Sequence, residues 1–257
     1  MSIDNSVDEH LYRIFTENFT ARDIATALVS FDETAPAADV KQFMLERHFR
    51  IVGIRRHGLV VGFVKQDELD GDTCSDRICE IGQEDVIDAW SPFTSIIAAL
   101  RDRDRVFVRS FGQIGGLVSR SDLQKPPVRM WLFGMVTIIE MKLNRMIERR
   151  FPNDSWCNTI SAGRLEKARL LLDERRRRNQ DLGLLDCLQF SDKGQLVAKD
   201  KQLRDRVGFA SRRAAEETIK ELETLRNGLA HSQAIASSDW ETIFRLAKNL
   251  RDILAIA

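Results

Sequence analysis

Residues 105–123 read RVFVRSFGQIGGLVSRSDL and hold the clearest structural signal of the chain. Two short apolar runs lie on either side of a turn at Gly112, which is the pattern of a β-hairpin. About 54 residues earlier the chain repeats this pattern, because residues 51–69 read IVGIRRHGLVVGFVKQDEL with a turn at Gly58. A repeat at a fixed period identifies a fold more firmly than any local preference for helix or strand.

A helical stretch precedes each hairpin, at residues 38–47 and 95–101. Apolar residues at helical spacing are Val40, Phe43 and Met44 in the first stretch and Ile96, Ile97 and Leu100 in the second. The sequence therefore predicts two copies of one unit, a helix followed by two short strands, at residues 20–70 and 71–126. Residues 1–19 are predicted to form an N-terminal helical extension.

Two such units in tandem resemble a pair of cystathionine β-synthase (CBS) domains, also called a Bateman module, over about residues 20–126. The most specific match is GLVSRSDL at residues 116–123. In that family a strand ends in Gly, Ile or Leu, Val, and Ser or Thr, and an Asp follows three residues after the hydroxyl. The resemblance implies that the Ser119 hydroxyl contacts a nucleotide phosphate and that the Asp122 carboxylate accepts charge-assisted hydrogen bonds from the ribose hydroxyls.

The first unit departs from this motif, because Lys65 takes the place of the hydroxyl and Glu68 takes the place of the Asp. Asp67, one residue earlier, would serve only with a shifted backbone. We therefore expect the better site for an adenine nucleotide (AMP, ADP or ATP) in the second unit, with Arg120 and Glu68 as further candidate contacts. The alternative for Asp122 is that it only caps the helix that follows it.

The charge of the chain is balanced overall but unevenly distributed. Residues 1–125 hold 15 Lys and Arg against 21 Asp and Glu, a net charge of −6, and residues 126–257 hold 24 against 18, a net charge of +6. This division indicates two modules that meet near Pro126, of which the second is better suited to approach a polyanion such as RNA. Mutual attraction of the two halves explains the same numbers.

Residues 127–257 have the periodicity of an all-α bundle of four or five helices. The first helix is predicted over 127–150, where the apolar residues at spacings of three and four are Leu132, Val136, Ile139, Leu143 and Met146. Trp131, Phe133 and Met135 add apolar surface on other faces, so several partners are expected to bury the first half of this helix. Further helices are predicted at 162–178, 182–188, 211–229 and 239–253, with a polar loop at 191–194.

The second predicted helix ends in four consecutive arginines, residues 175–178. Cations near a helix C-terminus are favoured by the helix dipole, which is one explanation. A surface that faces RNA is the other.

Residues 226–231 read RNGLAH at the end of the fourth predicted helix of the bundle. The segment resembles the R-x4–6-H signature of HEPN domains, small helical bundles many of which are metal-independent ribonucleases. A polar residue directly after the Arg, here Asn227, is also typical of that family. The number of helices, the place of the motif before the last helix and the apolar first helix agree with the family over roughly residues 128–257.

Arg226 and His231 are about 140° apart on a regular helix, so their side chains point to different sides. They share one site only if the helix breaks near Gly228 or if two copies of the chain assemble the site. HEPN domains dimerise through this face, so the resemblance implies a symmetric homodimer with two Arg and two His in one cleft.

These residue types suit cleavage of RNA by its own 2′-hydroxyl. His231 supplies an acid or base near neutral pH, and Arg226 directs planar donors at the developing phosphorane charge. Asn227 would hold the phosphate or orient His231. Glu140, midway along the first helix, is a candidate partner of Arg226, or else a solvated surface residue. The alternative role of His231 is a structural helix cap.

No metal site is expected. The four cysteines (Cys74, Cys79, Cys157 and Cys187) form no C-x-x-C pair and the four histidines are scattered, so free thiols are predicted. The longest apolar run, residues 130–139, is half of the roughly 20 residues that a membrane span needs. The first residues lack a basic segment followed by an apolar one, so a cytoplasmic protein without membrane contact is expected.

The sequence thus predicts an α+β protein in which tandem CBS domains precede a HEPN-like bundle. The leading hypothesis is a ribonuclease that an adenine nucleotide regulates and that needs no cofactor for catalysis. Two others stay open: a non-catalytic nucleotide sensor whose bundle dimerises or docks a partner, and a toxin or defence component held inactive by a partner. The complete pair of Arg226 and His231 favours the first, since a purely structural bundle has no need of it.

Overall fold

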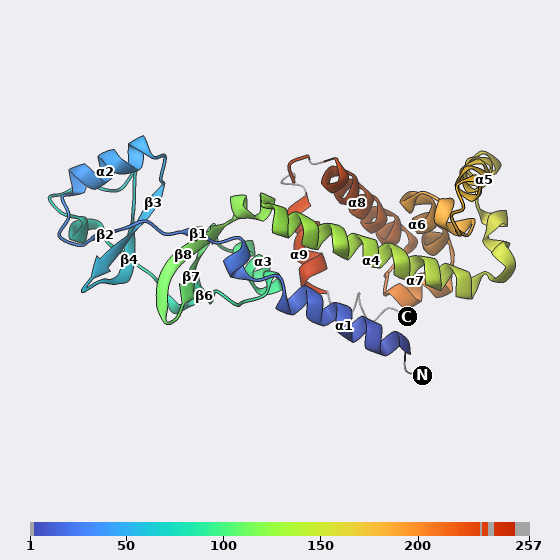
Figure 1. The fold of residues 1–257 in the computed structure, drawn as a ribbon, viewed down its shortest axis with the longest axis horizontal. Helices are drawn as coiled ribbons and strands as arrows, with labels where there is room; N and C mark the ends of the chain where they lie inside the picture. Colours follow the sequence, from blue (N-terminus) through green and yellow to red (C-terminus); the bar gives the residue numbers. More distant parts are fainter. Residues whose placement is uncertain (1–2, 232, 236–238, 250–257) are drawn as a thin grey trace. The chain divides into compact units, whose positions relative to one another are not determined.

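The structure, a computed structural model, describes residues 3–231, 233–235 and 239–249. The described residues divide into two units, Arg13–Val128 and the remainder, which we call the β unit and the helical unit. The chain is therefore an α+β protein with two small sheets followed by a helical region, as the sequence predicts (Figure 1).

Two four-stranded sheets form the framework of the β unit. One has the strand order β2–β3–β4–β5 and the other β1–β8–β7–β6, so each of the two predicted hairpins lies at the centre of a sheet (Figure 1). The strands are β1 Thr26–Ala27, β2 Ser30–Asp32, β3 Ile51–Arg56, β4 Leu59–Lys65, β5 Cys79–Glu80, β6 Val86–Asp88, β7 Arg105–Ser110 and β8 Gln113–Ser119.

The two repeats exchange one outer strand each. β1 precedes the first hairpin in the chain but pairs antiparallel with β8, with Thr26 opposite Leu117. β5 follows the first hairpin and pairs antiparallel with β4, with Gly62 opposite Glu80. β2 and β6 pair parallel with β3 and β7. Each sheet thus holds one strand from the sequence of the other repeat, and the two repeats are tied together by backbone hydrogen bonds.

The hairpin turns show why the repeat is readable in the sequence. His57 and Gly58 have φ of 51° and 81°, and Phe111 and Gly112 have φ of 49° and 81°. Positive φ at both central residues is the geometry of the turn that matches the twist of the flanking strands. Glycine adopts it without strain, which explains a glycine at the same place in both hairpins.

One helix packs on each hairpin, α2 (Ala37–Glu46) in one apolar cluster with β3 and β4, and α3 (Phe93–Arg101) beside β7. Of the predicted apolar faces, Val40 and Met44 in α2 and Ile96, Ile97 and Leu100 in α3 are buried. Phe43 of α2 is half-buried. Between the sheets, the rings of Phe63 and Phe107 lie 5.2 Å apart. The core of the β unit therefore follows the alternation of apolar residues along its strands and helices.

The helical unit contains α4 (Pro126–Arg150), α5 (Ala162–Arg177), α6 (Phe190–Lys199), α7 (Lys201–Val207), α8 (Arg212–Ala230) and α9 (Trp240–Lys248), and α1 spans Ile3–Glu17 (Figure 1). All five residues of the predicted α4 stripe are buried, as are Trp131 and Met135. Phe133 differs from the prediction, because 44% of its surface stays exposed. Residues 250–253 of the last predicted helix lie outside the described residues.

The region around residues 182–207 differs most from the prediction. The short helix predicted at 182–188 is only a 3₁₀ turn at Leu185–Cys187, and the predicted polar loop at 191–194 lies inside α6. Asp192 and Lys193 are buried there, because Arg164 and Glu140 pair with them. A β-carbon at Gly194 would lie 2.2 Å from the Ile219 Cγ2 atom, so glycine allows α6 and α8 to pack closely.

Candidate functional site

The first candidate site lies where β8 passes into the 3₁₀ helix η4 (Arg120–Gln124). Asp122 Oδ2 accepts hydrogen bonds from the Ser119 N–H at 2.8 Å and from the Ser119 hydroxyl at 2.7 Å. Ser119 and Asp122 thus form a capping box, which ties the end of β8 to the first turn of η4. The capping role considered for Asp122 is present in the structure.

The other carboxylate oxygen of Asp122 binds two side chains that the sequence analysis missed. Oδ1 accepts a hydrogen bond from the Thr26 hydroxyl at 3.1 Å and lies 2.8 Å from Lys125 Nζ. Lys125 also donates to the Ile24 carbonyl oxygen at 2.6 Å and to Thr26 Oγ1 at 2.9 Å. Lys125 could have been recognised from the sequence, because it lies three residues after Asp122. Thr26 could not, because it lies 96 residues away from Asp122 in the chain.

Asp122 is 8% exposed. Burial by itself raises the pKa of this carboxyl, but hydrogen bonds from Lys125 and from the Ser119 backbone and hydroxyl outweigh burial and lower the pKa below its ordinary value. The group is therefore an ionised acceptor at neutral pH, and every further donor must share its oxygens with the present partners.

The equivalent place in the first repeat carries an ion pair. Lys65 Nζ lies 2.7 Å from Glu68 Oε1, and more than half of the Glu68 side chain is exposed. The hydrogen bond with Glu68 raises the pKa of Lys65. The Arg120 guanidinium donates to the carbonyl oxygens of Leu100 at 3.0 Å and Arg101 at 2.8 Å, at the end of α3. The contacts of Glu68 and Arg120 are thus with Lys65 and α3 and not with Asp122.

The second candidate site lies at the C-terminal end of α8. The helix continues without a break through Gly228 to Ala230, and His231 is its C-cap. Arg226 and His231 therefore stay about 140° apart in one chain. The end of the helix is held by Arg129, which donates to the carbonyl oxygens of Leu229 at 3.2 Å and Gln233 at 2.7 Å. His231 is exposed.

Glu140 of α4 lies between two cations. Its Oε1 atom is 2.7 Å from Lys193 Nζ of α6, and its Oε2 atom is 3.9 Å from Arg226 Nε of α8. The Lys193 side chain is 3% exposed and the Arg226 side chain 42%. Arg226 Nη1 also donates to Asn227 Oδ1 at 3.4 Å. The structure thus brings Glu140 and Asn227 to Arg226 and adds Lys193, which no local pattern marked.

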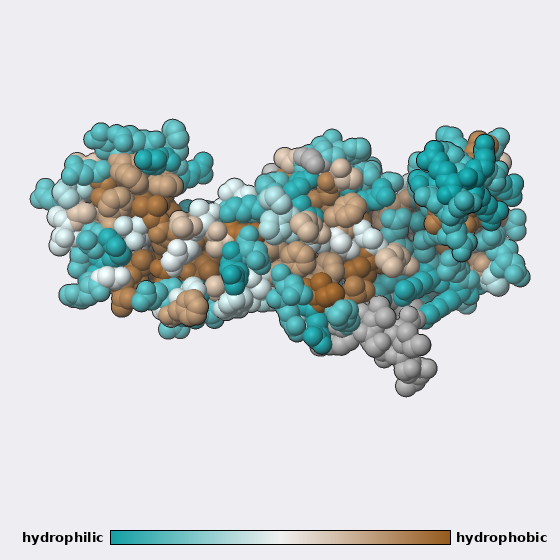
Figure 2. All heavy atoms as spheres, viewed as in Figure 1, coloured by the Kyte–Doolittle hydropathy of each residue, from teal (hydrophilic) through white to brown (hydrophobic). Residues whose placement is uncertain are grey.

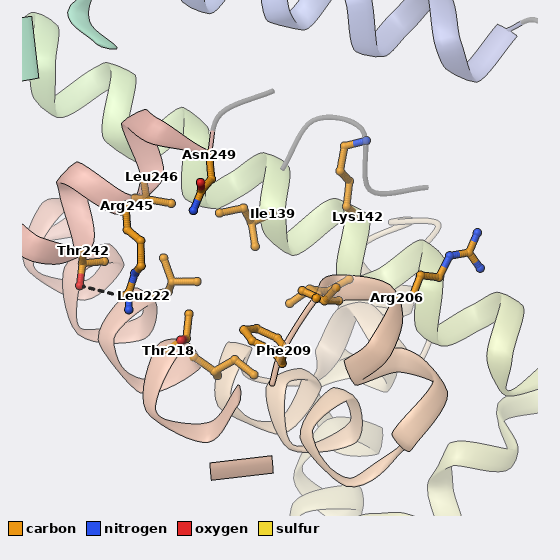
Figure 3. A pocket seen from close by; sticks show the side chains of 14 residues that line it. Ile139, Lys142, Arg206, Phe209, Thr218, Leu222, Thr242, Arg245, Leu246 and Asn249 are labelled. Carbon is orange, nitrogen blue, oxygen red and sulfur yellow. Dashed lines mark hydrogen bonds between the residues drawn. The ribbon is translucent and has the colours of Figure 1, made fainter. Parts of the chain in front are cut away.

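A cavity of about 550 Å³ lies elsewhere in the helical unit, between α4, the α7–α8 connection, α8 and α9 (Figure 3). Its walls are mainly apolar, with Ile139, Phe209 and Leu222 among the lining residues. Lys142 and Arg206 extend away from the cavity in Figure 3. None of the four residues proposed for catalysis from the sequence lines it.

Two of the four arginines at residues 175–178 bind residues of α5, and Arg175 donates to Gln180 Oε1 just beyond the helix. Arg178 Nη2 lies 2.5 Å from Glu174 Oε1, and Arg177 Nε donates to the Asp173 carbonyl oxygen at 3.3 Å. Figure 2 shows hydrophilic surface over the part of the view where α5 lies in Figure 1. Both explanations of this basic segment, helix dipole and RNA-facing surface, agree with such contacts.

The remaining observations concern metals, thiols and membranes. Across the described part of the chain, no three His, Cys, Asp or Glu side chains gather in a way that could hold a metal ion. The four cysteines are free, and burial raises the pKa of the Cys74 thiol. No helix among the described residues combines the length and the hydropathy that a membrane span requires.

A scan against models of protein families gives no match, and neither does a search of curated proteins. Among solved structures, the chain is similar to the CBS domain of the bacterial CNNM/CorC family Mg²⁺ transporter in complex with ATP, with 19% identity, a TM-score of 0.37 and coverage of 49% of this chain and 97% of that one. It is also similar to CBSX2 from Arabidopsis thaliana in complex with AMP, with 15% identity, a TM-score of 0.36 and coverage of 41% and 93%.

A third similar structure is the CBS domain of a CBS-domain-containing membrane protein from Sphaerobacter thermophilus, with 17% identity, a TM-score of 0.37 and coverage of 47% and 94%. All three are CBS-domain structures, and each covers about half of this chain or less. Identities and TM-scores of this size describe a distant likeness in fold.

Proposed function

We propose that the chain is an adenine-nucleotide sensor whose helical unit cleaves RNA as a homodimer without a metal ion. One observation supports the nucleotide site most strongly. A hydroxyl and a buried, ionised carboxylate lie together at the end of β8, at Ser119 and Asp122. The equivalent residues of the first repeat, Lys65 and Glu68, neutralise each other at the surface. The ligand is therefore expected in the second repeat.

A nucleotide that binds Asp122 must displace the side chains that now bind this carboxylate. A ribose hydroxyl that donates to Oδ1 competes with Lys125 and Thr26, which now bind that oxygen. A displaced Lys125 ammonium is then able to bind a phosphate. Because Lys125 directly precedes Pro126, the first residue of α4, binding changes the contacts at the point where that helix begins.

Isothermal titration calorimetry with AMP, ADP and ATP tests the nucleotide site on the full chain. The variants are Asp122→Asn, which keeps the shape of the side chain, and Ser119→Ala. Glu46→Gln, which changes an exposed carboxylate of α2 that binds Gln42, is the control. We expect weaker binding in the first two variants and unchanged binding in the control. Equal affinity in all four proteins, or no binding by the wild type, would remove the assignment.

RNA cleavage is proposed for the C-terminal end of α8. The Arg226 guanidinium is partly exposed and only loosely paired with Glu140, so it remains able to bind a phosphate. His231 is exposed at the helix end and supplies an acid or base near neutral pH. Asn227 lies beside Arg226 and would hold the same phosphate.

A homodimer is part of this proposal, because Arg226 and His231 diverge on one unbroken helix. The surface proposed for it is the exposed side of α4, where Met130 is 67%, Phe133 44% and Met141 51% exposed. These three residues recur at helical spacing next to Glu140, and we call them the α4 patch. Apolar patches of this kind mark interaction surfaces.

Incubation of the purified chain with mixed RNA, with and without EDTA, tests cleavage. His231→Ala should lower the rate by roughly 10²–10⁴-fold, while His10→Ala, an exposed histidine of α1, should not. Cleavage should persist in EDTA and leave cyclic phosphate ends, and DNA of the same sequence should survive. Undiminished cleavage by His231→Ala would indicate a contaminating nuclease or a different site.

A non-catalytic sensor is the second candidate function, because Arg226 and His231 do not converge within one chain. In that case the helical unit serves only to dimerise or to dock a partner. Wild-type protein that binds a nucleotide and dimerises but cleaves no RNA, with or without nucleotide, would favour this candidate.

A further inference from the structure

Lys193 is a buried charge in the middle of the helical unit. It lies in α6, and its side chain is 3% exposed. Lysine is almost never buried to this extent unless it is paired. Its Nζ atom lies 2.7 Å from Glu140 Oε1, which supplies the pairing charge. A protein in which well-packed apolar residues replace a buried ion pair is often as stable or more stable. Stability alone therefore does not account for the ion pair between Lys193 and Glu140.

The position of Lys193 is held on two sides. The neighbouring Asp192 pairs with Arg164 of α5, Nη1 to Oδ1 at 2.5 Å. On the other side Gly194 lets α6 approach α8 until a β-carbon would collide with Ile219. Lys193 therefore reaches Glu140 from a backbone with little freedom to shift.

Glu140 shares its charge unequally between its two cations. Lys193 takes Oε1 at hydrogen-bond distance, whereas Arg226 Nε lies 3.9 Å from Oε2, beyond hydrogen-bond distance. A carboxylate without Lys193 would be free to turn both oxygens to the guanidinium, the geometry that arginine and carboxylate prefer. Arg226 would then be occupied by Glu140 and would lose its availability to another anion.

We propose that Lys193 is a positioning residue that keeps Arg226 available: by holding Glu140 Oε1, it prevents Glu140 from closing a bidentate ion pair with Arg226. The inference rests on the proposed function in one respect, namely that the available Arg226 serves to bind an RNA phosphate. The change in Arg226 itself can be measured without RNA.

Chemical modification by phenylglyoxal, mapped by mass spectrometry, measures the availability of Arg226 in the full chain. Lys193→Met should slow modification of Arg226 by about tenfold, the factor that corresponds to 1.4 kcal/mol of added pairing. The double variant Lys193→Met/Glu140→Gln should restore the wild-type rate, because an uncharged side chain cannot form the ion pair. Lys199→Met is the matched control, since Lys199 lies on the same helix but binds the Thr159 carbonyl oxygen.

Binding of a labelled single-stranded RNA at several salt concentrations gives the second readout. Loss of one phosphate contact lowers the slope of log K against log salt by about 0.7, and we expect this loss in Arg226→Ala and in Lys193→Met but not in the double variant. Unchanged modification of Arg226 in a folded Lys193→Met, or no recovery in the double variant, overturns the inference. If Lys193→Met does not fold, Lys193→Gln takes its place. The expected modification pattern without any RNA binding would contradict the proposed function and leave the inference on Arg226 standing.

Discussion

Asp122→Ala should destabilise the sheet that contains β7 and β8 by about 2 kcal/mol. The substitution removes the capping box with Ser119, worth about 1 kcal/mol. It also removes the ion pair with Lys125, worth about 1 kcal/mol, because the Lys125 side chain is 35% exposed and keeps its bonds to Ile24 and Thr26. The cost is thus that of a structural cap and not of a fully buried charge pair.

Hydrogen exchange, followed by mass spectrometry on peptides from β8, measures this change within the full chain. A loss of about 2 kcal/mol corresponds to roughly 30-fold faster exchange of amides that open with the sheet. The matched control is Glu68→Ala, which removes only an exposed ion pair with Lys65. Exchange of β4 should therefore accelerate much less in the control than exchange of β8 does in Asp122→Ala.

The difference between exchange of β8 in Asp122→Ala and exchange of β4 in Glu68→Ala tests the asymmetry between the two repeats. If Asp122→Ala left β8 unchanged, or if Glu68→Ala accelerated β4 as much as Asp122→Ala accelerates β8, the buried box at Asp122 would not be the asymmetry that we describe. An increase in helix α8 exchange of the same size would show that the effect is not confined to the β unit.

Burial raises the pKa of Asp122, but the hydrogen bonds from Lys125 and Ser119 outweigh burial and lower the pKa in the folded state. The stability that the ionised carboxylate contributes is therefore fully present above its unfolded pKa of about 3.9 and is lost as the pH falls through the lower, folded pKa. The difference in melting temperature between wild type and Asp122→Asn should be full near neutral pH and shrink below about pH 4. Phe133→Glu should place a charge in the α4 patch and shift the protein from dimer to monomer in light scattering, whereas Leu45→Glu, at a more exposed position on α2, should not. Gly194→Ala should cost about 1–3 kcal/mol in urea unfolding, because its β-carbon meets Ile219; a neutral effect would mean that α6 and α8 can separate at no cost.

Local periodicity was sufficient to predict most of the framework. The strands of both hairpins and the buried face of α4 follow from alternation and helical spacing, because a strand or helix with one face in the core repeats apolar residues at its own period. The turns at Gly58 and Gly112 added a second local signal, since their backbone conformation favours glycine.

Local periodicity could not predict the exchange of β1 and β5 between the two sheets. β1 and β5 are two residues long, too short to show a period, and their partners lie about 90 and 17 residues away in the chain. Only backbone hydrogen bonds between distant segments decide which sheet each of them completes. The same holds for Thr26, which reaches Asp122 through this exchange.

The sequence alone identified Glu140 as a candidate partner of Arg226, since both belong to recognisable helices. It placed Asp192 and Lys193 in a polar loop, because a local pattern assigns charged residues to solvent. The tertiary structure buries both inside α6, where Arg164 and Glu140 supply the opposite charges from other helices. A charge can be buried only when a partner is brought to it, and no local stretch of sequence contains that partner.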